Sequence, residues 1–279
     1  MARPLLIGVV NITADSFSDG GRFLDPEAAV AHAAALAADG ADIVELGAAA
    51  SNVVSAAVSP AEEISRLRPV IAALAARGGT PIAVDTSQPE TQLFALAQRV
   101  DYLNDVEGFP EPSLYPALAD AASCRLVVMH AAQGRGRAQQ LDLPPDEVWQ
   151  RIERFFDARV AGLVGAGVAR DRLILDPGMG FFLSSLPEAS LRVLARLDRL
   201  KAAFGLPVMV SVSRKSFLGA LTGRTLPADR GAATLAAELY AAAHGADYIR
   251  THEPGALRDA LIVTEALNAE AQRDSRANL

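Results

Sequence analysis

Short apolar runs alternate with longer amphipathic segments along the whole chain, and this alternation restricts the fold more than any other feature. Eight of the runs have the length and composition of buried strands: residues 5–10, 42–46, 81–84, 102–103, 125–129, 172–175, 207–212 and 247–249. Several are continuously apolar, which is typical of parallel strands that are covered on both faces. Eight strands in a chain of 279 residues leave roughly 35 residues for each strand and its connection, the length of one βα unit.

The segments between these runs carry helical signals. Apolar residues recur every three or four positions, for example at Ile64, Leu67 and Ile71. Prolines stand near the expected helix starts, where a missing backbone N–H costs nothing, at positions 26, 60, 89, 112 and 145. Asp25 and Ser59 precede two of these prolines and are the expected N-caps.

These signals predict an α/β protein whose residues 1–268 form a single (β/α)8 TIM barrel, followed by a polar C-terminal tail of residues 269–279. An open, doubly wound sheet is the alternative. That fold requires a glycine-rich first turn and a single crevice where the strand order reverses. Residues 11–21 do not have the composition of such a turn, which favours the barrel.

Composition and charge exclude several classes of partner. The formal net charge is −7 and no segment is rich in Lys or Arg, so nucleic acid is not an expected partner. An anionic ligand would have to be met by a few placed cations. The single cysteine, Cys124, rules out an intrachain disulfide and is expected to be a buried structural thiol. No apolar run reaches the ~20 residues of a membrane helix and no signal peptide is evident, so we expect no membrane partner and a cytoplasmic location.

Polar residues follow the end of nearly every predicted strand. In a (β/α)8 barrel the carboxyl ends of the strands form the face that carries the catalytic groups. The residues at these ends are Asn11, Glu45, Asp85, Asn104, Asp105, His130, Asp176, Ser213, Lys215, Ser216, Arg250 and His252. Taken singly, Asp85 could cap a helix, and His130 could be a structural histidine. Asp105 and Glu107 could simply hydrogen-bond loops, so the prediction of a binding site depends on the convergence of the whole set.

The chemistry of this set is specific enough to suggest a ligand. Asp85, Asn104 and Asp176 provide acceptors and one amide, which suit a flat, nitrogen-rich ring with donor edges, such as an aminopyrimidinone. Lys215 and Arg250 are the cations, and Arg250 could stack on the ring or bind a phosphate through two hydrogen bonds.

The first predicted strand ends in residues that suit a metal ion. Asn11 and Asp15 carry oxygen atoms, the donors that a hard cation such as Mg²⁺ prefers. A polar ring with a charged leaving group, bound beside a metal ion, is therefore consistent with the residues alone.

The motifs that carry these residues resemble those of dihydropteroate synthases. Residues 11–21, NITADSFSDGG, are similar to the first signature of that family, with Ala14 in place of a proline. Later motifs follow in the family's order: Asp85-Thr86, Asn104-Asp105, Met129-His130, DPGMGF at 176–181, SRKS at 213–216 and RTH at 250–252. The resemblance covers nearly the whole chain. It implies a barrel transferase that joins 6-hydroxymethyl-7,8-dihydropterin pyrophosphate to p-aminobenzoate, giving 7,8-dihydropteroate and pyrophosphate for folate biosynthesis.

The resemblance also implies roles for individual residues. The pterin would be held by Asp85, Asn104, Asp176, Phe181, Lys215 and Arg250. Pyrophosphate would be bound by Asn11, Ser51, Arg250 and His252, and p-aminobenzoate by Ser51, Phe182, Lys215 and Ser216. Asn11 would bind Mg²⁺, the expected cofactor. The catalytic residues would be Asp85, Lys215, Arg250 and His252, in a reaction where pyrophosphate leaves before the amine attacks a cationic pterin methylene.

Two loops and one strand depart from the family pattern. Asn52 stands where an arginine usually contacts pyrophosphate, Glu45 replaces an expected aspartate, and Phe182 is an extra aromatic residue. Ser51-Asn52, together with GMGFF at 178–182, is similar to the acquired sulfonamide-insensitive dihydropteroate synthases. The hypothesis is that Phe182 clashes with the sulfonyl substituent of these drugs and spares p-aminobenzoate. The alternative is that Phe182 merely packs under its loop.

Two other functions stay open at this point. One is a non-catalytic pterin-binding homologue, in which the departures mark lost activity. The other is a pterin-dependent methyltransferase-type barrel, which needs no pyrophosphate site and is disfavoured by the SRKS and RTH motifs. The family is usually dimeric, and the alanine-rich segments 232–243 and 256–269 could pack closely, so a homodimer is expected.

Overall fold

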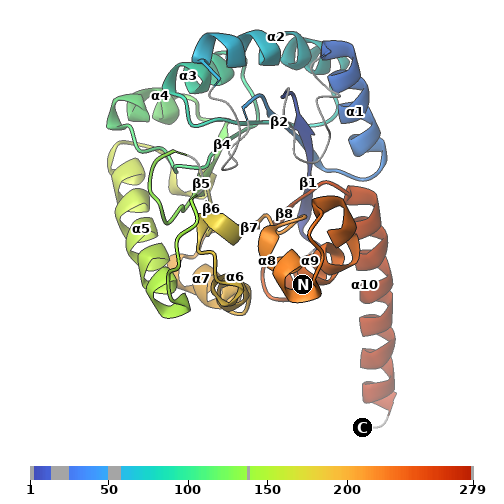
Figure 1. The fold of residues 1–279 in the computed structure, drawn as a ribbon. Coiled ribbons are helices and arrows are strands. Elements are labelled where there is room, and N and C mark those ends of the chain that lie inside the picture. Colours follow the sequence, from blue (N-terminus) through green and yellow to red (C-terminus); the bar gives the residue numbers. More distant parts are fainter. Residues whose placement is uncertain (1–2, 14–24, 50–57, 137–138, 278–279) are drawn as a thin grey trace.

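A closed barrel is the architecture of the computed structural model, which describes residues 3–13, 25–49, 58–136 and 139–277. Within these ranges eight parallel strands surround one axis and helices cover the outside (Figure 1). The strands are β1 (Leu5–Asn11), β2 (Ile43–Gly47), β3 (Ile82–Asp85), β4 (Tyr102–Asp105), β5 (Arg125–Met129), β6 (Leu173–Asp176), β7 (Met209–Val210) and β8 (Tyr248–Thr251). Their order is β6-β5-β4-β3-β2-β1-β8-β7, and a parallel bridge between Leu175 and Val208 joins the two ends. The predicted barrel is confirmed, and the open sheet is excluded by this closure.

The strand ends differ slightly from those predicted. Several strands continue one or two residues further, so that Asp85, Asn104 and Arg250 belong to strands rather than to the loops that follow them. The seventh strand is shorter than predicted and comprises Met209–Val210. A residue held in a strand has a fixed direction, so this extension orients the polar side chains.

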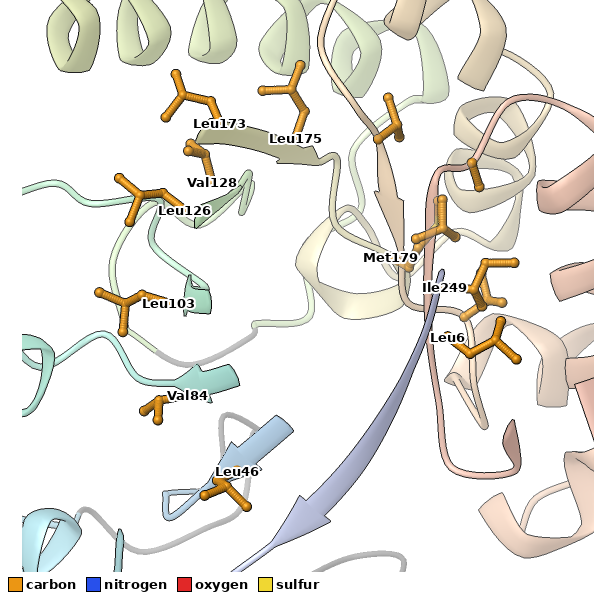
Figure 2. Close-up of a cluster of buried hydrophobic side chains, with 14 of the residues drawn as sticks. Leu6, Leu46, Val84, Leu103, Leu126, Val128, Leu173, Leu175, Met179 and Ile249 are labelled. Atoms are coloured by element: carbon orange, nitrogen blue, oxygen red, sulfur yellow. The ribbon is translucent and has the colours of Figure 1, made fainter. Parts of the chain in front are cut away.

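The interior of the barrel is apolar at the level of the strand starts. One inward-facing cluster contains Ile7, Ile43, Ala83, Val127, Ile174, Met209 and Tyr248, with Tyr102 packed against it. The intervening strand residues point outward, and Figure 2 shows several of them in the layer between strands and helices, among them Leu46, Val84 and Leu126. Because side chains alternate along a strand, a residue two positions after an interior residue also faces inward.

Helix starts follow the predicted proline pattern. The helices are α1 (Pro26–Ala38), α2 (Pro60–Arg77), α3 (Pro89–Ala97), α4 (Tyr115–Asp120), α5 (Pro145–Gly165), α6 (Pro187–Leu194), α7 (Leu197–Phe204), α8 (Ser216–Thr222), α9 (Gly231–Ala243) and α10 (Pro254–Ala277). The Asp25 side chain accepts a hydrogen bond from the N–H of Glu27 at 3.2 Å, and Ser59 accepts one from Glu62 at 3.3 Å. Both predicted N-caps are confirmed.

The last helix includes most of the predicted tail. Residues 269–277 continue α10 as a helix, and Figure 1 shows this end extending beyond the barrel. In the part of the chain that the structure describes, no helix combines the length and apolar character that crossing a membrane requires.

Candidate active site

The strand register brings polar residues of neighbouring strands into one row at the carboxyl end of the barrel. Asn11 is level with Gly47, Gly47 with Asp85, and Asp85 with Asn104. Gly47 contributes no side chain to this row, and a Cβ atom at that position would lie 3.9 Å from Oδ1 of Asn11. The polar groups of β1, β3 and β4 therefore share one level of the barrel.

The alternation of side chains explains why polar groups face inward here. Five of them stand two positions after an apolar residue of the interior cluster: Glu45 after Ile43, Asp85 after Ala83, Asn104 after Tyr102, Asp176 after Ile174 and Arg250 after Tyr248. Each pair lies on the same face of its strand, so the polar side chain is stacked above the apolar one. The result is a polar level on an apolar floor.

Arg250 on β8 is held between two acids from other strands. Its Nε donates to Oε1 of Glu45 on β2, and its Nη2 donates to Oδ2 of Asp85 on β3 at 3.2 Å. Burial and then the neighbouring Glu45 carboxylate raise the pKa of the Asp85 carboxyl above its usual range, and Arg250 opposes this rise. Two acids thus share one guanidinium, so the Asp85 carboxyl can still accept a hydrogen bond from a ligand or stabilise a positive charge on it.

Asn104 on β4 is buried and has only one end of its amide satisfied. Its Nδ2 donates to Oε2 of Glu45 at 3.1 Å. Its Oδ1 is buried and has no hydrogen-bond partner among the described residues. A buried carbonyl oxygen without a donor costs free energy, so a ring N–H or amino group of a ligand would be bound favourably here.

Asp176 at the end of β6 is fixed by a turn that requires glycine. Its Oδ1 accepts the backbone N–H of Gly178 at 2.8 Å. Gly178 has a φ of +76°, and a Cβ atom there would lie 2.4 Å from the carbonyl oxygen of His130. Burial raises the pKa of Asp176 to about 6, while the Gly178 N–H and the charge of Lys215 oppose this rise.

Lys215 precedes α8 and faces the same acids. Burial, with a contribution from Arg250, lowers its pKa to about 8, against the attraction of Asp176 and Asp85. The structure therefore brings together the acceptors and both cations that the sequence predicted for one site.

Two aromatic residues lie beside Lys215, in the 3₁₀ turn that follows β6. Phe182 is 7% exposed and packs in a small cluster with Met129, and the partly buried Phe181 lies against that cluster. The Nζ of Lys215 lies 5.2 Å from the centroid of the Phe182 ring, a cation–π contact. Phe182 therefore packs against Met129 and Ala131 and also contacts a cation of the site.

His252 is oriented by a serine from the neighbouring strand end. Oγ of Ser213 accepts the backbone N–H of His252 at 3.3 Å and lies 2.8 Å from its Nδ1. The Ser213 hydroxyl can donate to Nδ1 or accept from it, and in either case the two contacts fix the position of the ring. Ser216, the first residue of α8, has its Oγ 3.5 Å from the position of a Cβ on Gly180, beside the aromatic turn.

Four other candidates of the sequence have structural contacts. Asp105 accepts hydrogen bonds from three donors, each at 2.8 Å, and Glu107 accepts one from a backbone N–H at 2.7 Å, as expected of loop residues. His130 is buried with its Nδ1 3.2 Å from the carbonyl oxygen of Pro177, and burial lowers its pKa to about 4. Cys124 is buried, and burial raises its pKa to about 12, as expected of a structural thiol.

The predicted metal ligand Asn11 ends β1 at the rim of the barrel. Ser51, Asn52 and Asp15 lie outside the described residues. Among the residues that are described, no three His, Cys, Asp or Glu side chains are grouped closely enough to enclose a metal ion. One carboxamide oxygen suits Mg²⁺ only if waters and substrate phosphates supply the remaining ligands, which is how this ion is usually held beside a phosphorylated substrate.

Comparison with known proteins decides the family. Residues 7–252 match the family described as pterin binding enzyme. The type-2 dihydropteroate synthase of Escherichia coli is 57% identical over 268 residues, which cover 96% of this chain and 97% of that protein. The chain belongs to the dihydropteroate synthase family. A type-1 dihydropteroate synthase of Mycolicibacterium fortuitum is 52% identical over 276 residues, 99% of this chain and 96% of that protein. The solved dihydropteroate synthase of Xanthomonas albilineans with 4-aminobenzoic acid has a TM-score of 0.85 and 40% identity, covering 96% of this chain and 94% of that one.

Membership of the dihydropteroate synthase family confirms the fold and the transferase class predicted from the sequence. The sequence placed Glu45 among the polar residues at strand ends but gave it no role of its own. Its position two residues after the inward-facing Ile43 was the signal that could have placed it in the site. The contacts of Ser213 with His252 and of Phe182 with Lys215 had no comparable signal, because they join loops.

Proposed function

We propose that this chain joins 6-hydroxymethyl-7,8-dihydropterin pyrophosphate to p-aminobenzoate, giving 7,8-dihydropteroate and pyrophosphate in folate biosynthesis. One observation carries the proposal: acceptors from β3, β4 and β6, two of them buried and one partly buried, face inward beside two cations. Asp85, Asn104 and Asp176 match a ring whose edge consists of N–H and amino donors. Lys215 and Arg250 match the anionic groups of the two substrates.

The pterin is assigned to the inward-facing side chains of the strands. Oδ1 of Asn104, which lacks a protein donor among the described residues, and the carboxyl of Asp176 would accept from the ring. Phe181 would pack against the bicyclic ring, and Arg250 would stack on it while remaining paired with Asp85. Lys215 would donate to a ring acceptor from the side of Asp176.

The anionic groups are assigned to the rim. Pyrophosphate would be bound by Arg250, by the ring of His252 that Ser213 positions, and by Asn11 and Ser51. The carboxylate end of p-aminobenzoate would lie near Ser216 and Lys215, with Phe182 and Ser51 beside the aromatic ring. The part assigned to Ser51 rests on the resemblance of its motif.

The chemistry requires no side-chain nucleophile. The bond between the pterin methylene carbon and the pyrophosphate oxygen breaks, and its electron pair leaves with pyrophosphate. The amine nitrogen of p-aminobenzoate then forms the new carbon–nitrogen bond and releases a proton. Asp85 would stabilise the positive charge of the pterin, while Arg250 and His252 would stabilise the departing anion.

Mg²⁺ fits this scheme as the expected cofactor. When bound, the ion would neutralise charge on the pyrophosphate, and Asn11 would supply a protein oxygen to it. Asp85, Lys215, Arg250 and His252 are the residues we propose to be catalytic.

The function is tested by pyrophosphate release. Purified protein with dihydropterin pyrophosphate and Mg²⁺ is expected to release pyrophosphate on addition of p-aminobenzoate, with an equal amount of dihydropteroate formed. Asp85→Asn is expected to lower kcat about a hundredfold or more, since the ring loses its nearest negative charge. Asp105→Asn is the matched control, because Asp105 hydrogen-bonds the loop after β4. Tight pterin binding without release would overturn the proposal in favour of a non-catalytic homologue.

We further propose that the turn carrying Phe182 lowers sensitivity to sulfonamides. The ring is held by its cluster and by Lys215, so its position near the p-aminobenzoate carboxylate is rigid. A drug with a substituted, tetrahedral sulfonyl group at that point would meet the ring, whereas the flat carboxylate would not.

A homodimer and a cytoplasmic location are the remaining proposals. The dimer is supported by apolar residues exposed on the two last helices, which pack against each other: Tyr240 on α9 and Ile262, Val263 and Leu267 on α10. Valine and leucine four positions apart on α10 lie on one side of the helix, which suits burial against a second copy.

A further inference from the structure

Glu45 joins three strands within the polar level of the barrel. It lies on β2 with 1% of its surface exposed. One carboxylate oxygen, Oε1, accepts the Nε–H of Arg250 from β8, and the other, Oε2, accepts the Nδ2–H of Asn104 from β4 at 3.1 Å. Each of these strands is separated from β2 by one intervening strand, so the carboxylate bridges both sides of the barrel interior.

This bridge decides which end of the Asn104 amide faces a ligand. An amide has a donor end and an acceptor end of nearly the same size, and either can point inward. A carboxylate only accepts, so a reversed amide would place two acceptors against each other at the distance of a hydrogen bond. Glu45 therefore directs Nδ2 toward itself and leaves Oδ1 of Asn104 facing away, buried and without a donor in the described structure.

The same bridge sets the plane of the Arg250 guanidinium. Nε is bound to Glu45 and Nη2 to Asp85, and two contacts on a rigid, planar group define its orientation. Both side chains that Glu45 holds are ones proposed to contact the pterin.

We propose that Glu45 is a positioning residue for the ring-binding site. It presents the Asn104 oxygen as an acceptor for a ring N–H or amino group, and it holds Arg250 in the plane needed to contact the same ring. The inference rests on the proposed function, because it takes the ligand to be a pterin. Glu45 itself is buried and acts through Asn104 and Arg250.

The effect is measured by pterin binding in four variants. Affinity for 6-hydroxymethylpterin is followed by its fluorescence in wild type, Glu45→Gln, Asn104→Ala and the double variant. Glu45→Gln is expected to weaken binding by about tenfold to a hundredfold. Glutamine has one acceptor oxygen and one donor nitrogen, so it cannot accept from both Asn104 and Arg250 as the carboxylate does, and either end of the Asn104 amide can face it. In the Asn104→Ala background the same substitution is expected to cost at least about threefold less, since the amide is gone.

Conservative rescue and a control separate positioning from stability. Glu45→Asp keeps the charge and both acceptor oxygens and is expected to recover most of the affinity. The KM for p-aminobenzoate is expected to stay within about twofold in all Glu45 variants, because the contacts of Glu45 in the described structure are with Asn104 and Arg250, which are assigned to the pterin. Glu63→Gln is the matched control: Glu63 is also 1% exposed and accepts from Thr86 and Gln88, outside the site.

Three results would overturn the inference. They are unchanged pterin affinity in Glu45→Gln, a loss of equal size with and without Asn104, and a loss of equal size in Glu63→Gln. If Glu45→Gln does not fold, the same comparison is made with Glu45→Ala against Asn104→Ala, Glu45→Ala, where unequal losses support the inference and equal losses overturn it. Wild-type protein that binds no pterin would instead refute the proposed function, from which the inference follows.

Discussion

Acids and amines in the site have pKa values displaced toward one another. Burial raises the pKa of Asp176 to about 6 and lowers that of Lys215 to about 8, because removal from water disfavours the charged form of each. Their attraction limits both shifts. A ligand that brings hydrogen-bond donors to Asp176 and an anionic group to Lys215 therefore meets two groups that are already close to the charge state needed for binding.

The displaced pKa of Lys215 predicts an alkaline limit to activity. Lys215 must be protonated to bind an anion, so kcat/KM for p-aminobenzoate is expected to fall above about pH 8. Lys215→Arg is expected to move this limb beyond the measured range, whatever its effect on the maximum rate, because arginine stays protonated. Lys201, which is partly exposed and pairs with Asp247, provides the matched control Lys201→Arg. A limb that remains at about pH 8 in Lys215→Arg would assign it to another group.

Phe182 provides a second prediction at the same scale. Phe182→Gly is expected to lower the ratio of the sulfonamide inhibition constant to the KM for p-aminobenzoate by about tenfold or more, because the rigid ring is removed. Phe182→Leu keeps much of the buried volume in the cluster with Met129 and should fold more stably than the glycine variant. Both ratios are measured on folded enzyme, with growth of a synthase-deficient host on sulfonamide as the second readout. Unchanged tolerance in Phe182→Gly would refute the role of the ring.

The elements of the fold align polar groups by simple periodicities. Each inward polar residue follows an inward apolar residue by two positions on its strand, and parallel pairing puts strand ends at one level. The helices on the outside repeat about every 3.6 residues instead of every two, so one face of each helix is turned toward the strands.

The inner face of α9 carries one acid. Glu238 is 2% exposed on the face of α9 that lies toward β8, near Thr251 and Glu253.

Glu238 is expected to make stability depend on pH. Burial raises its pKa to about 8, against the hydrogen bond with Thr251. A carboxyl with a folded pKa above its unfolded value stabilises the protein fully below the unfolded value, and this stability is lost as pH rises through the folded pKa. In the wild-type protein, the free energy of unfolding is expected to fall by up to roughly 1.4 kcal/mol per pH unit between about pH 4.5 and about pH 8 because of Glu238. Glu238→Gln should remove this fall.

Urea unfolding at pH 5 and pH 7.5 measures this difference. The variant is expected to gain stability relative to wild type at the higher pH, and its gain should be small at the lower one. Glu265→Gln, on the exposed side of α10, is the control for loss of a glutamate charge on a helix. Parallel pH dependences of Glu238→Gln and wild type would show that Glu238 is ionised in the folded protein.

At the scale of the whole molecule, barrel closure gathers residues that are distant in sequence. Arg250 and Glu45 are 205 positions apart, and their contact exists because β8 returns beside β1. Closure also leaves the outer surfaces of α9 and α10 at one side of the barrel, with α10 extending past it (Figure 1).

A dimer formed through these helices gives a whole-molecule prediction. The wild-type chain is expected to sediment as two copies, and Leu267→Glu is expected to shift it toward one copy, because a buried charge without a partner is costly. Leu93→Glu, at an exposed leucine of α3, is the matched control and should leave the mass unchanged. Equal effects of both substitutions, or a wild-type monomer, would refute the interface.

Local patterns in the sequence determined the barrel and most of its site. Continuous apolar runs, prolines at helix starts and polar strand ends are set by neighbouring residues. They suffice to predict the polar set Asn11, Asp85, Asn104, Asp176, Lys215 and Arg250. The roles given to Ser51, Phe181 and Phe182 rest on motif resemblance.

Only the tertiary structure decided how these residues act on one another. That Glu45 orients Asn104 and Arg250 follows from strand register and barrel closure. The contacts of Ser213 with His252 and of Lys215 with Phe182 exist because closure brings loops from different strands together at one end of the barrel. Local periodicity determines which way a side chain faces. It contains no information on which side chain from another strand it will meet, because that depends on the pairing of segments far apart in the chain.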